Sequence, residues 1–358
     1  MDDSKFNKYK TVSEIIKKAS DEVIKLCHEK NGINYICGYS DNLIKNELSK
    51  IYKKSSKGLM IPTCISRNEI VSHCNIYEND LLKDGDILRI EVAVHIDNNV
   101  VNYGNTIRVG YETWNEGIIN AAKVALKLGV QNIEPNMDIL QFKKVINEVA
   151  EYYNLNLLKR PDVYNEEDTT IFYDWCFRDS DRFNEPSWVV KYEHELELDE
   201  NYYEDDEIDK NDNFKIGEAY HLTVAFTESG KKTKISDVKP CLFQNTKIKT
   251  NLKVNRSREV ISEVNNKLDK VFFKINDLSL DASKAKLGLR ECIDKGVIRS
   301  LGIVECNMNV VILKCTIIVQ KNSVYILGED YDMEGIELSG NLERIKNLDK
   351  KFIRREII

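Results

Sequence analysis

Apolar residues recur at helical intervals in the first fifty residues of the chain. Thr11 and Glu14 have the spacing of a capping box, and apolar side chains then follow every three or four positions. This pattern predicts a helix over about 12–29. A second helix is expected to follow Ser40 as its N-cap, with one apolar face formed by Leu43, Ile44, Leu48 and Ile51.

Segments rich in β-branched residues come next. They predict strands at 59–66, 86–96, 100–108, 217–227, 309–319 and 322–327. Asp97, Asn98 and Asn99 are expected to turn the chain between two of these strands, and helical periodicity returns at about 114–128, 138–152, 256–270 and 283–297. Because helices are interleaved with hairpins, without strict β-α-β alternation, we expect an α+β fold. The stretch 155–215 shows no clear period, and a long irregular loop is expected around 193–213.

The composition is that of a globular protein. Of 358 residues, 42% are hydrophobic and 31% are charged, which excludes a wholly disordered chain and allows one large domain or two smaller ones. We find no apolar stretch long enough to span a bilayer and no secretory signal, so a cytoplasmic protein without a membrane partner is expected, with the nucleus and nucleolus as open alternatives. Nine scattered cysteines without a C-x-x-C pair predict reduced, buried thiols rather than disulfides or a zinc site.

The net charge of -7 hides a segregation of charge along the chain. Residues 193–212 carry eleven acids and one lysine, a net of -10, so the rest of the chain carries +3. Residues 231–258 hold seven lysines and two arginines against one aspartate. A single basic run is usually a solvated face, but several such runs beside one acidic loop favour a polyanionic partner such as RNA.

Two segments resemble a known family. GLMIPTCISRNEIVSH at 58–73 and LLKDGDILRIEVAVHIDNNVVNYGNTIRVG at 81–110 are similar to the core of the type 2 methionine aminopeptidases, and more similar still to their non-peptidase relatives, the proliferation-associated, ErbB-receptor-binding proteins. Residues 254–292 resemble the helical insertion of that branch. The resemblance implies one pseudo-symmetric pita-bread domain over 1–335, with an insertion at about 249–309 and an acidic loop at about 193–213, and then a short basic tail at 336–358.

The enzymes of this family bind two divalent metal ions through two aspartates eleven residues apart, one histidine and two glutamates, which activate a water molecule. The resemblance places Glu91 and Asn102 at the aspartate positions and Thr223 and Lys314 at the glutamate positions, and 168–180 contains no histidine. We therefore expect a pseudo-enzyme without a cofactor, although Glu91 leaves binding of a single metal ion open. His73 matches a substrate-contacting histidine and is assigned no catalytic role.

The resemblance implies a protein that binds the large ribosomal subunit near the nascent-chain exit, in ribosome biogenesis or translation control. Its partners would be rRNA and exit-site ribosomal proteins, and it would act as a monomer. Phosphate recognition by basic side chains suits such docking. The candidate RNA contacts are Lys53, Lys54, Lys57, Lys231, Lys232, Lys234, Lys247, Lys249, Lys253, Arg256 and Arg258.

Two alternatives remain open at this point. One is a diverged metallo-aminopeptidase that rebuilds its site from other residues, and the other is a peptide- or protein-binding module that uses the vestigial pocket. Other reactions have no support, because the motifs of serine hydrolases, P-loop enzymes, dinucleotide-binding enzymes and zinc proteases are absent. Cys74 follows His73, but neighbouring side chains on a strand point to opposite faces. The two residues therefore cannot readily form a Cys-His catalytic pair.

Overall fold

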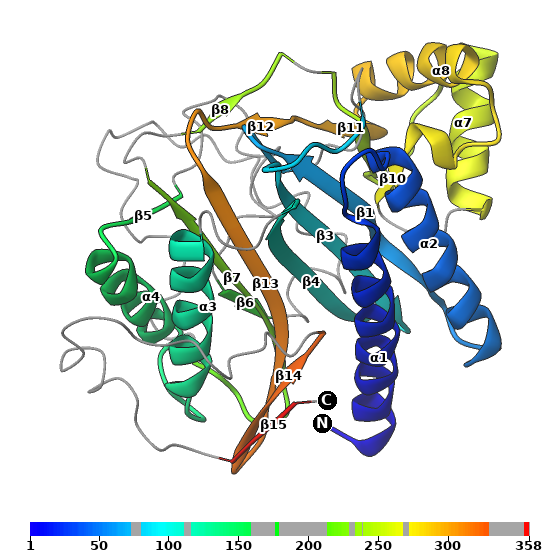
Figure 1. Ribbon diagram of the computed structural model, residues 1–358. Helices are drawn as coiled ribbons and strands as arrows, with labels where there is room; N and C mark the ends of the chain where they lie inside the picture. Colours follow the sequence, from blue (N-terminus) through cyan, green and yellow to red (C-terminus); the bar gives the residue numbers. More distant parts are fainter. Residues whose placement is uncertain are drawn as a thin grey trace, which may run out of the picture.

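A long, mainly antiparallel sheet forms the centre of the protein (Figure 1). The computed structural model describes residues 1–72, 80–110, 116–158, 176–178, 213–228, 233–237, 239–267, 272–328 and 354–357. Within them the main path of the sheet runs β1 (Lys57–Arg67), β3 (Ile87–Ile96), β4 (Asn99–Arg108), β13 (Val310–Val319), β14 (Ser323–Leu327) and β15 (Arg354–Ile357). The strand β7 (Ala219–Thr227) pairs with β13, and β5 (Asn156–Leu157) and β6 (Cys176–Arg178) pair with β7.

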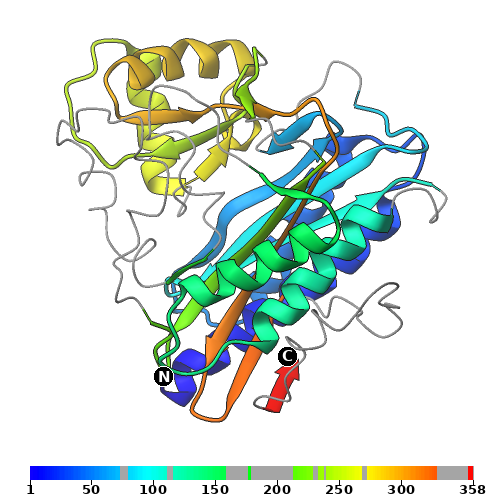
Figure 2. The same cartoon turned by 90° about the vertical axis from the view of Figure 1, so that its left-hand side faces the viewer.

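Two pairs of helices cover one face of this sheet. The first pair, α1 (Asp3–Leu26) and α2 (Ile33–Lys50), packs on β1, β3 and β4, and the second pair, α3 (Glu116–Gln131) and α4 (Leu140–Tyr152), packs on β7 and β13. Figure 1 shows the pairs on opposite sides of the seam between β4 and β13, and Figure 2 shows α3 and α4 side by side. Each half of the sheet therefore has its own core beneath its own helix pair.

A smaller unit lies beyond the edge of the main sheet, and we call residues 239–301 the insertion. It contains the sheet β10-β9-β11, formed by β9 (Leu242–Asn245), β10 (Phe272–Lys274) and β11 (Ile298–Leu301), together with η2 (Ile275–Asp277) and the helices α7 (Asn255–Lys267) and α8 (Ala282–Asp294). A further small sheet joins β2 (Ile70–Ser72), β12 (Val304–Glu305) and β8 (Lys234–Ile235). The two insertion helices approach closely at Gly288, where a Cβ atom would lie 2.5 Å from the carbonyl oxygen of Arg256.

A buried ion pair attaches the insertion to the main domain. Lys274 Nζ on β10 donates to Asp41 Oδ2 on α2 at 2.6 Å and to the carbonyl oxygen of Thr63 on β1 at 3.4 Å. The other carboxylate oxygen of Asp41 accepts from the Thr63 amide at 2.8 Å. The side chains of Lys274 and Asp41 are only 10% and 5% exposed, so both charges depend on each other for compensation.

The expected α+β class and long strands are confirmed, but two predicted helix starts are wrong. The first helix begins at Asp3, because the Asp2 side chain caps it by accepting from the Lys5 amide at 2.7 Å, and nothing interrupts the helix before Thr11. The second begins at Ile33, and Ser40 is buried inside it, where its hydroxyl accepts from Thr63 Oγ1. The short strands β2, β8, β9, β10, β11 and β12 were not predicted, since two to four residues are too few to establish a period.

Local turn chemistry and cysteine burial agree with expectation where the structure describes them. Asp97 and Asn98 have φ angles of 49° and 61°, the left-handed conformation that a tight hairpin requires. Seven cysteines of the described ranges are buried and form no disulfide. Burial raises the pKa of Cys37 and of Cys315 to about 12, so these thiols stay protonated and unreactive at neutral pH.

Among the residues that the structure describes, we find no helix with the length and apolar character needed to cross a membrane.

Candidate functional site

Three of the four positions implied by the family resemblance lie in one row across the central strands. Backbone pairing places Glu91 opposite Gly104, Gly104 opposite Lys314, and Lys314 opposite Thr223. Their chain neighbours Val92, Leu313 and Val224 belong to the cores beneath the helices. Because side chains alternate along a strand, Glu91, Lys314 and Thr223 point to the face that the helices leave uncovered. The structure thus brings together three residues that are far apart in the sequence.

A buried ion pair occupies this row. The ammonium group of Lys314 bonds Oε1 of Glu91, and the two side chains are 2% and 6% exposed. The lysine must cross β4 to reach β3, and Gly104 lies directly beneath its path. A Cβ atom at position 104 would be 2.9 Å from both Cβ and Cγ of Lys314. Glycine is therefore required here so that the lysine stem can lie across the strand.

The neighbouring row contains Asn102, which is a structural part of the seam. Its backbone N–H donates to Thr316 Oγ1 at 2.8 Å, and Nδ1 of His221 lies 2.9 Å from the same oxygen. On the other side of the ion pair, Thr106 Oγ1 donates to the carbonyl oxygen of Ile312 at 2.9 Å and accepts from its amide. Threonine hydroxyls thus complete the pairing of β4 with β13 on both sides of Lys314.

Buried polar residues that sequence reasoning missed surround the same face. His221 and Arg89 are each 1% exposed. The guanidinium of Arg89 donates to the carbonyl oxygens of Val310, Asn68 and Ile70, so it holds the β1–β2 turn against the start of β13. The available signal was positional, since Arg89 precedes Glu91 by two residues and His221 precedes Thr223 by two, which puts each pair on one face.

The residues at the family's metal positions do not fit a pair of divalent metal ions. Asn102 and Thr223 offer neutral oxygens, and the Lys314 ammonium already bonds the remaining carboxylate, Glu91. Two adjacent cations need anionic oxygen ligands, and a buried ammonium repels them. Within the described ranges no group of three or more His, Cys, Asp or Glu side chains is arranged to hold a metal ion.

The structure separates the described basic candidates into engaged and unengaged groups. Lys57 Nζ donates to the carbonyl oxygens of Ile51 and Tyr52 and so closes the C-terminal end of α2. Lys234 pairs with Glu305 at 2.8 Å. The other engaged candidates are Arg256, which donates to both carboxylate oxygens of Glu259, and Arg258, which donates to Leu252 O and to Asn255.

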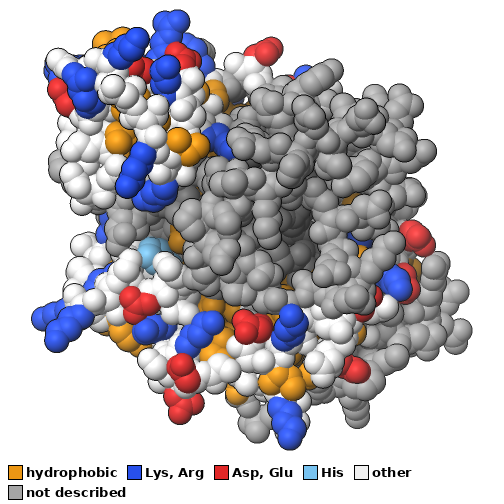
Figure 3. Space-filling model, turned by 180° about the vertical axis from the view of Figure 1, so that it is seen from behind, with side chains coloured by type: hydrophobic (Ala, Val, Ile, Leu, Met, Phe, Trp, Pro, Cys, Tyr) orange, Lys and Arg blue, Asp and Glu red, His pale blue; other side chains and the backbone are white. Residues whose placement is uncertain are grey.

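The unengaged lysines lie at two separate places. Lys247, Lys249 and Lys253 are exposed on the insertion, and Figure 3 shows Lys and Arg side chains gathered over this part of the molecule. Lys53 and Lys54 are exposed just after the far end of α2, which with 18 residues is about 27 Å long. His73, Lys231, Lys232 and the acidic segment 193–212 lie outside the described residues.

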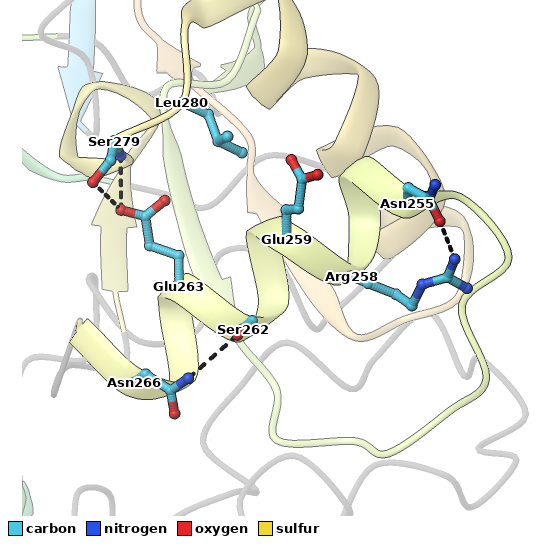
Figure 4. Close-up of a pocket in the computed structure, with 8 residues that line it drawn as sticks. All are labelled: Asn255, Arg258, Glu259, Ser262, Glu263, Asn266, Ser279 and Leu280. Carbon is cyan, nitrogen blue, oxygen red and sulfur yellow. Dashed lines mark hydrogen bonds between the residues drawn. The ribbon is translucent and has the colours of Figure 1, made fainter.

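An open groove of about 600 Å³ lies on the insertion, apart from the row of Lys314. One face of α7 and two residues before α8 form it. Figure 4 shows Arg258 joined to Asn255 at one end of the groove and Glu263 joined to Ser279 at the other. The lining residues are Asn255, Arg258, Glu259, Ser262, Glu263, Asn266, Ser279 and Leu280. Two carboxylates make this groove a poor site for a phosphate.

Comparison with known proteins places the chain among the relatives of methionine aminopeptidases. The model of metallopeptidase family M24 matches residues 7–174. The ErbB-3 binding protein 1 of Arabidopsis thaliana is 27% identical over 304 residues, which cover 81% of this chain and 70% of that protein. Proliferation-associated protein A of Dictyostelium discoideum is 24% identical over 349 residues, covering 91% and 82%.

Solved structures agree on the fold. A thermophilic Arx1 superposes with a TM-score of 0.76 at 22% identity and covers 99% of this chain and all of its own. The methionine aminopeptidase of Thermotoga maritima has a TM-score of 0.55 at 12% identity, covering 92% and 98%. The chain is therefore similar in sequence to the ErbB-3-binding and proliferation-associated proteins and has the pita-bread fold of the methionine aminopeptidases.

Proposed function

We propose that this protein is a catalytically inactive homologue of the methionine aminopeptidases that acts by binding, with the RNA of the large ribosomal subunit near the nascent-chain exit as its partner. The ion pair of Lys314 with Glu91 carries the first half of this proposal. It supplies an internal cation where the enzymes bind metal ions, and it uses the one carboxylate of the four matched positions. Such a partner implies a location in the cytoplasm and at sites of ribosome assembly.

Divalent metal ions should neither stabilise this protein nor give it peptidase activity. A ligand that binds only the native state at 100 times its dissociation constant raises the free energy of unfolding by about 2.7 kcal/mol. We expect no rise in Tm when Co²⁺ or Mn²⁺ is added to chelator-treated protein, and no cleavage of a Met-Ala-Ser peptide. An active methionine aminopeptidase serves as the positive control. A metal-dependent turnover that Glu91→Gln abolishes would contradict the proposal and favour a diverged peptidase.

The charge of the insertion supports an RNA partner. Between residues 247 and 299 the chain has thirteen lysines and arginines against seven aspartates and glutamates. Of the described candidates there, Lys247, Lys249 and Lys253 are exposed and take part in no ion pair, while Arg256 and Arg258 are held by neighbours. The three lysines are therefore available to phosphates, whose recognition depends on charge rather than on base sequence.

Reversing these three charges should weaken binding to large ribosomal subunits. The variant Lys247→Glu, Lys249→Glu, Lys253→Glu is expected to cosediment at least tenfold less tightly at 100 mM salt, and the slope of log affinity against log salt should fall by about 2–3. Its Tm should stay near that of the wild type, because the three residues are exposed. Lys10→Glu with Lys17→Glu on α1 provides the control. Wild-type binding by the triple variant would refute this contact surface.

A further inference from the structure

The outward face of α2 differs from an ordinary solvated helix face because it carries no unpaired carboxylate. Asp41 is buried against Lys274, and Glu47, whose side chain is 20% exposed, is paired with Lys18 at 2.6 Å and with Lys50 at 3.1 Å. By contrast, α1 exposes acids at several positions, among them Asp3, Glu14 and Asp21. The exposed side chains of α2 are Asn34, Tyr35, Tyr39, Asn42, Lys45, Asn46, Ser49 and Lys50. Amide, hydroxyl and ammonium groups without carboxylates complement a polyanion.

Two tyrosines on this face present their rings to solvent. Tyr35 and Tyr39 are 59% and 38% exposed, and their ring centroids lie 6.3 Å apart. Gly38 is their neighbour on the helix, and a Cβ atom there would meet nothing within 4 Å. Glycine inside a helix is destabilising relative to alanine, and the packing of this fold gives no reason for it. A ligand that approaches the helix backbone closely would give one.

Free lysines continue this face beyond the C-terminal end of α2. Lys53 and Lys54 follow the helix directly and are exposed. The bonds from Lys57 to the carbonyl oxygens of Ile51 and Tyr52, just after the helix, hold the turn that carries Lys53 and Lys54. At its middle, α2 is bonded to the insertion through Asp41, and Figure 1 shows the helix running from the insertion toward the opposite end of the molecule. The face therefore ends at one of the two groups of unengaged lysines.

We propose that the outward face of α2 binds an unpaired stretch of RNA, with bases stacked on Tyr35 and Tyr39 and phosphates on Lys53 and Lys54. Aromatic side chains bind bases by stacking only where the base faces are accessible, and a duplex conceals them. The inference rests on the proposed function, whose partner is RNA, and it adds a second surface that requires unpaired nucleotides. The lysines of the insertion have no such requirement.

The test uses fluorescence anisotropy of the full chain with a labelled single-stranded RNA of roughly 12 nucleotides and mixed sequence. Tyr35→Ala and Tyr39→Ala should each weaken binding about tenfold, with an unchanged salt slope because no charge is lost. Lys53→Ala with Lys54→Ala should instead lower the salt slope by about 1.4. Ile216→Ala, which removes an equally exposed apolar side chain outside α2, is the control. Binding to a duplex of the same length should not respond to the tyrosine variants.

Gly38→Leu gives an independent check, since it adds a good helix former and should raise Tm while it blocks access to the helix and lowers affinity for the single strand. Affinity equal to that of the wild type in this variant and in both tyrosine variants would overturn the proposal. The proposal would also be overturned if the tyrosine variants no longer bind large subunits but still bind the single-stranded RNA with wild-type affinity. That result would assign the face to a protein partner. If the charge-reversal variant of Lys247, Lys249 and Lys253 binds large subunits like the wild type while the tyrosine variants lose affinity for RNA, only the contact surface on the insertion is refuted.

Discussion

Replacing Lys274 by methionine should lower the free energy of unfolding by about 3–5 kcal/mol. The substitution keeps most of the side-chain volume but removes the ammonium group, so the Asp41 carboxylate stays buried and retains only its bond from the Thr63 amide. An uncompensated buried charge costs this much because its lost hydration is not replaced. Urea unfolding monitored by circular dichroism measures the change. The insertion should also become more sensitive to proteolysis, since this ion pair links β10 to α2.

An exposed ion pair of the same chemistry provides the control for Lys274→Met. Lys284 and Asp281 lie 2.8 Å apart with side chains 53% and 52% exposed, so Lys284→Met should cost less than about 0.5 kcal/mol.

Burial by itself lowers the pKa of Lys274, but the Asp41 carboxylate outweighs burial and the pKa lies above the ordinary value. Because the pKa of Lys274 is higher in the folded than in the unfolded protein, the ion pair stabilises the fold fully at pH values below the unfolded-state pKa. This stabilisation is lost as the pH rises through the folded-state pKa. The difference between wild type and variant should therefore stay constant from pH 7 to about 10.

Glu91→Ala should destabilise the protein by a similar amount, about 3–5 kcal/mol, because it leaves the Lys314 ammonium buried without its counter-charge. Chemical unfolding again measures the change. If Glu91 were a vestigial metal position without a structural role, the loss in free energy of unfolding would be much smaller. Glu259→Ala is the matched control, because Glu259 pairs with Arg256 at 2.6 Å but both side chains are about 40% exposed, and its loss should cost less than about 1 kcal/mol.

A double variant separates the cost of the unpaired charge from the cost of lost packing. Glu91→Leu with Lys314→Met replaces both charges by apolar side chains of similar size and should recover most of the stability that Glu91→Ala loses. If the double variant is as unstable as the single one, the loss arises from packing around Gly104 rather than from the ammonium, and the electrostatic account of the site is wrong.

Much of the fold could be predicted because its signals are local. The strands β3, β4 and β13 are ten residues each, long enough for β-branched content and turn residues to mark them within about a residue. The start of α1 was misplaced for a local reason as well, since Thr11 with Glu14 and Asp2 with Lys5 are both plausible caps, and the chain extends the helix to the earlier one. The sheet of the insertion was not predicted because it is defined by pairing between short segments that are distant in the sequence.

The candidate site could be predicted only as a set of replaced residues. The resemblance placed Glu91, Asn102, Thr223 and Lys314 at the metal positions, but their meaning depended on the strand register. Only the structure puts Lys314 opposite Gly104 and so within reach of Glu91. It likewise shows that Arg256 and Arg258 are held by neighbours, whereas Lys253 is not. A basic residue in a sequence has no assigned counter-ion until the chain has folded.

The sequence by itself determined the α+β class and the segregation of charge, and its resemblance to the aminopeptidases predicted an amide, a hydroxyl and an ammonium group at metal-ligand positions. These follow from periodicity, composition and aligned motifs, which are properties of neighbouring residues. The tertiary structure decided which charges pair, as with Lys314 and Glu91 or Lys274 and Asp41, and it left neither acid of α2 without a basic partner. Pairing and exposure are set by contacts between segments distant in the chain, and no local pattern encodes them.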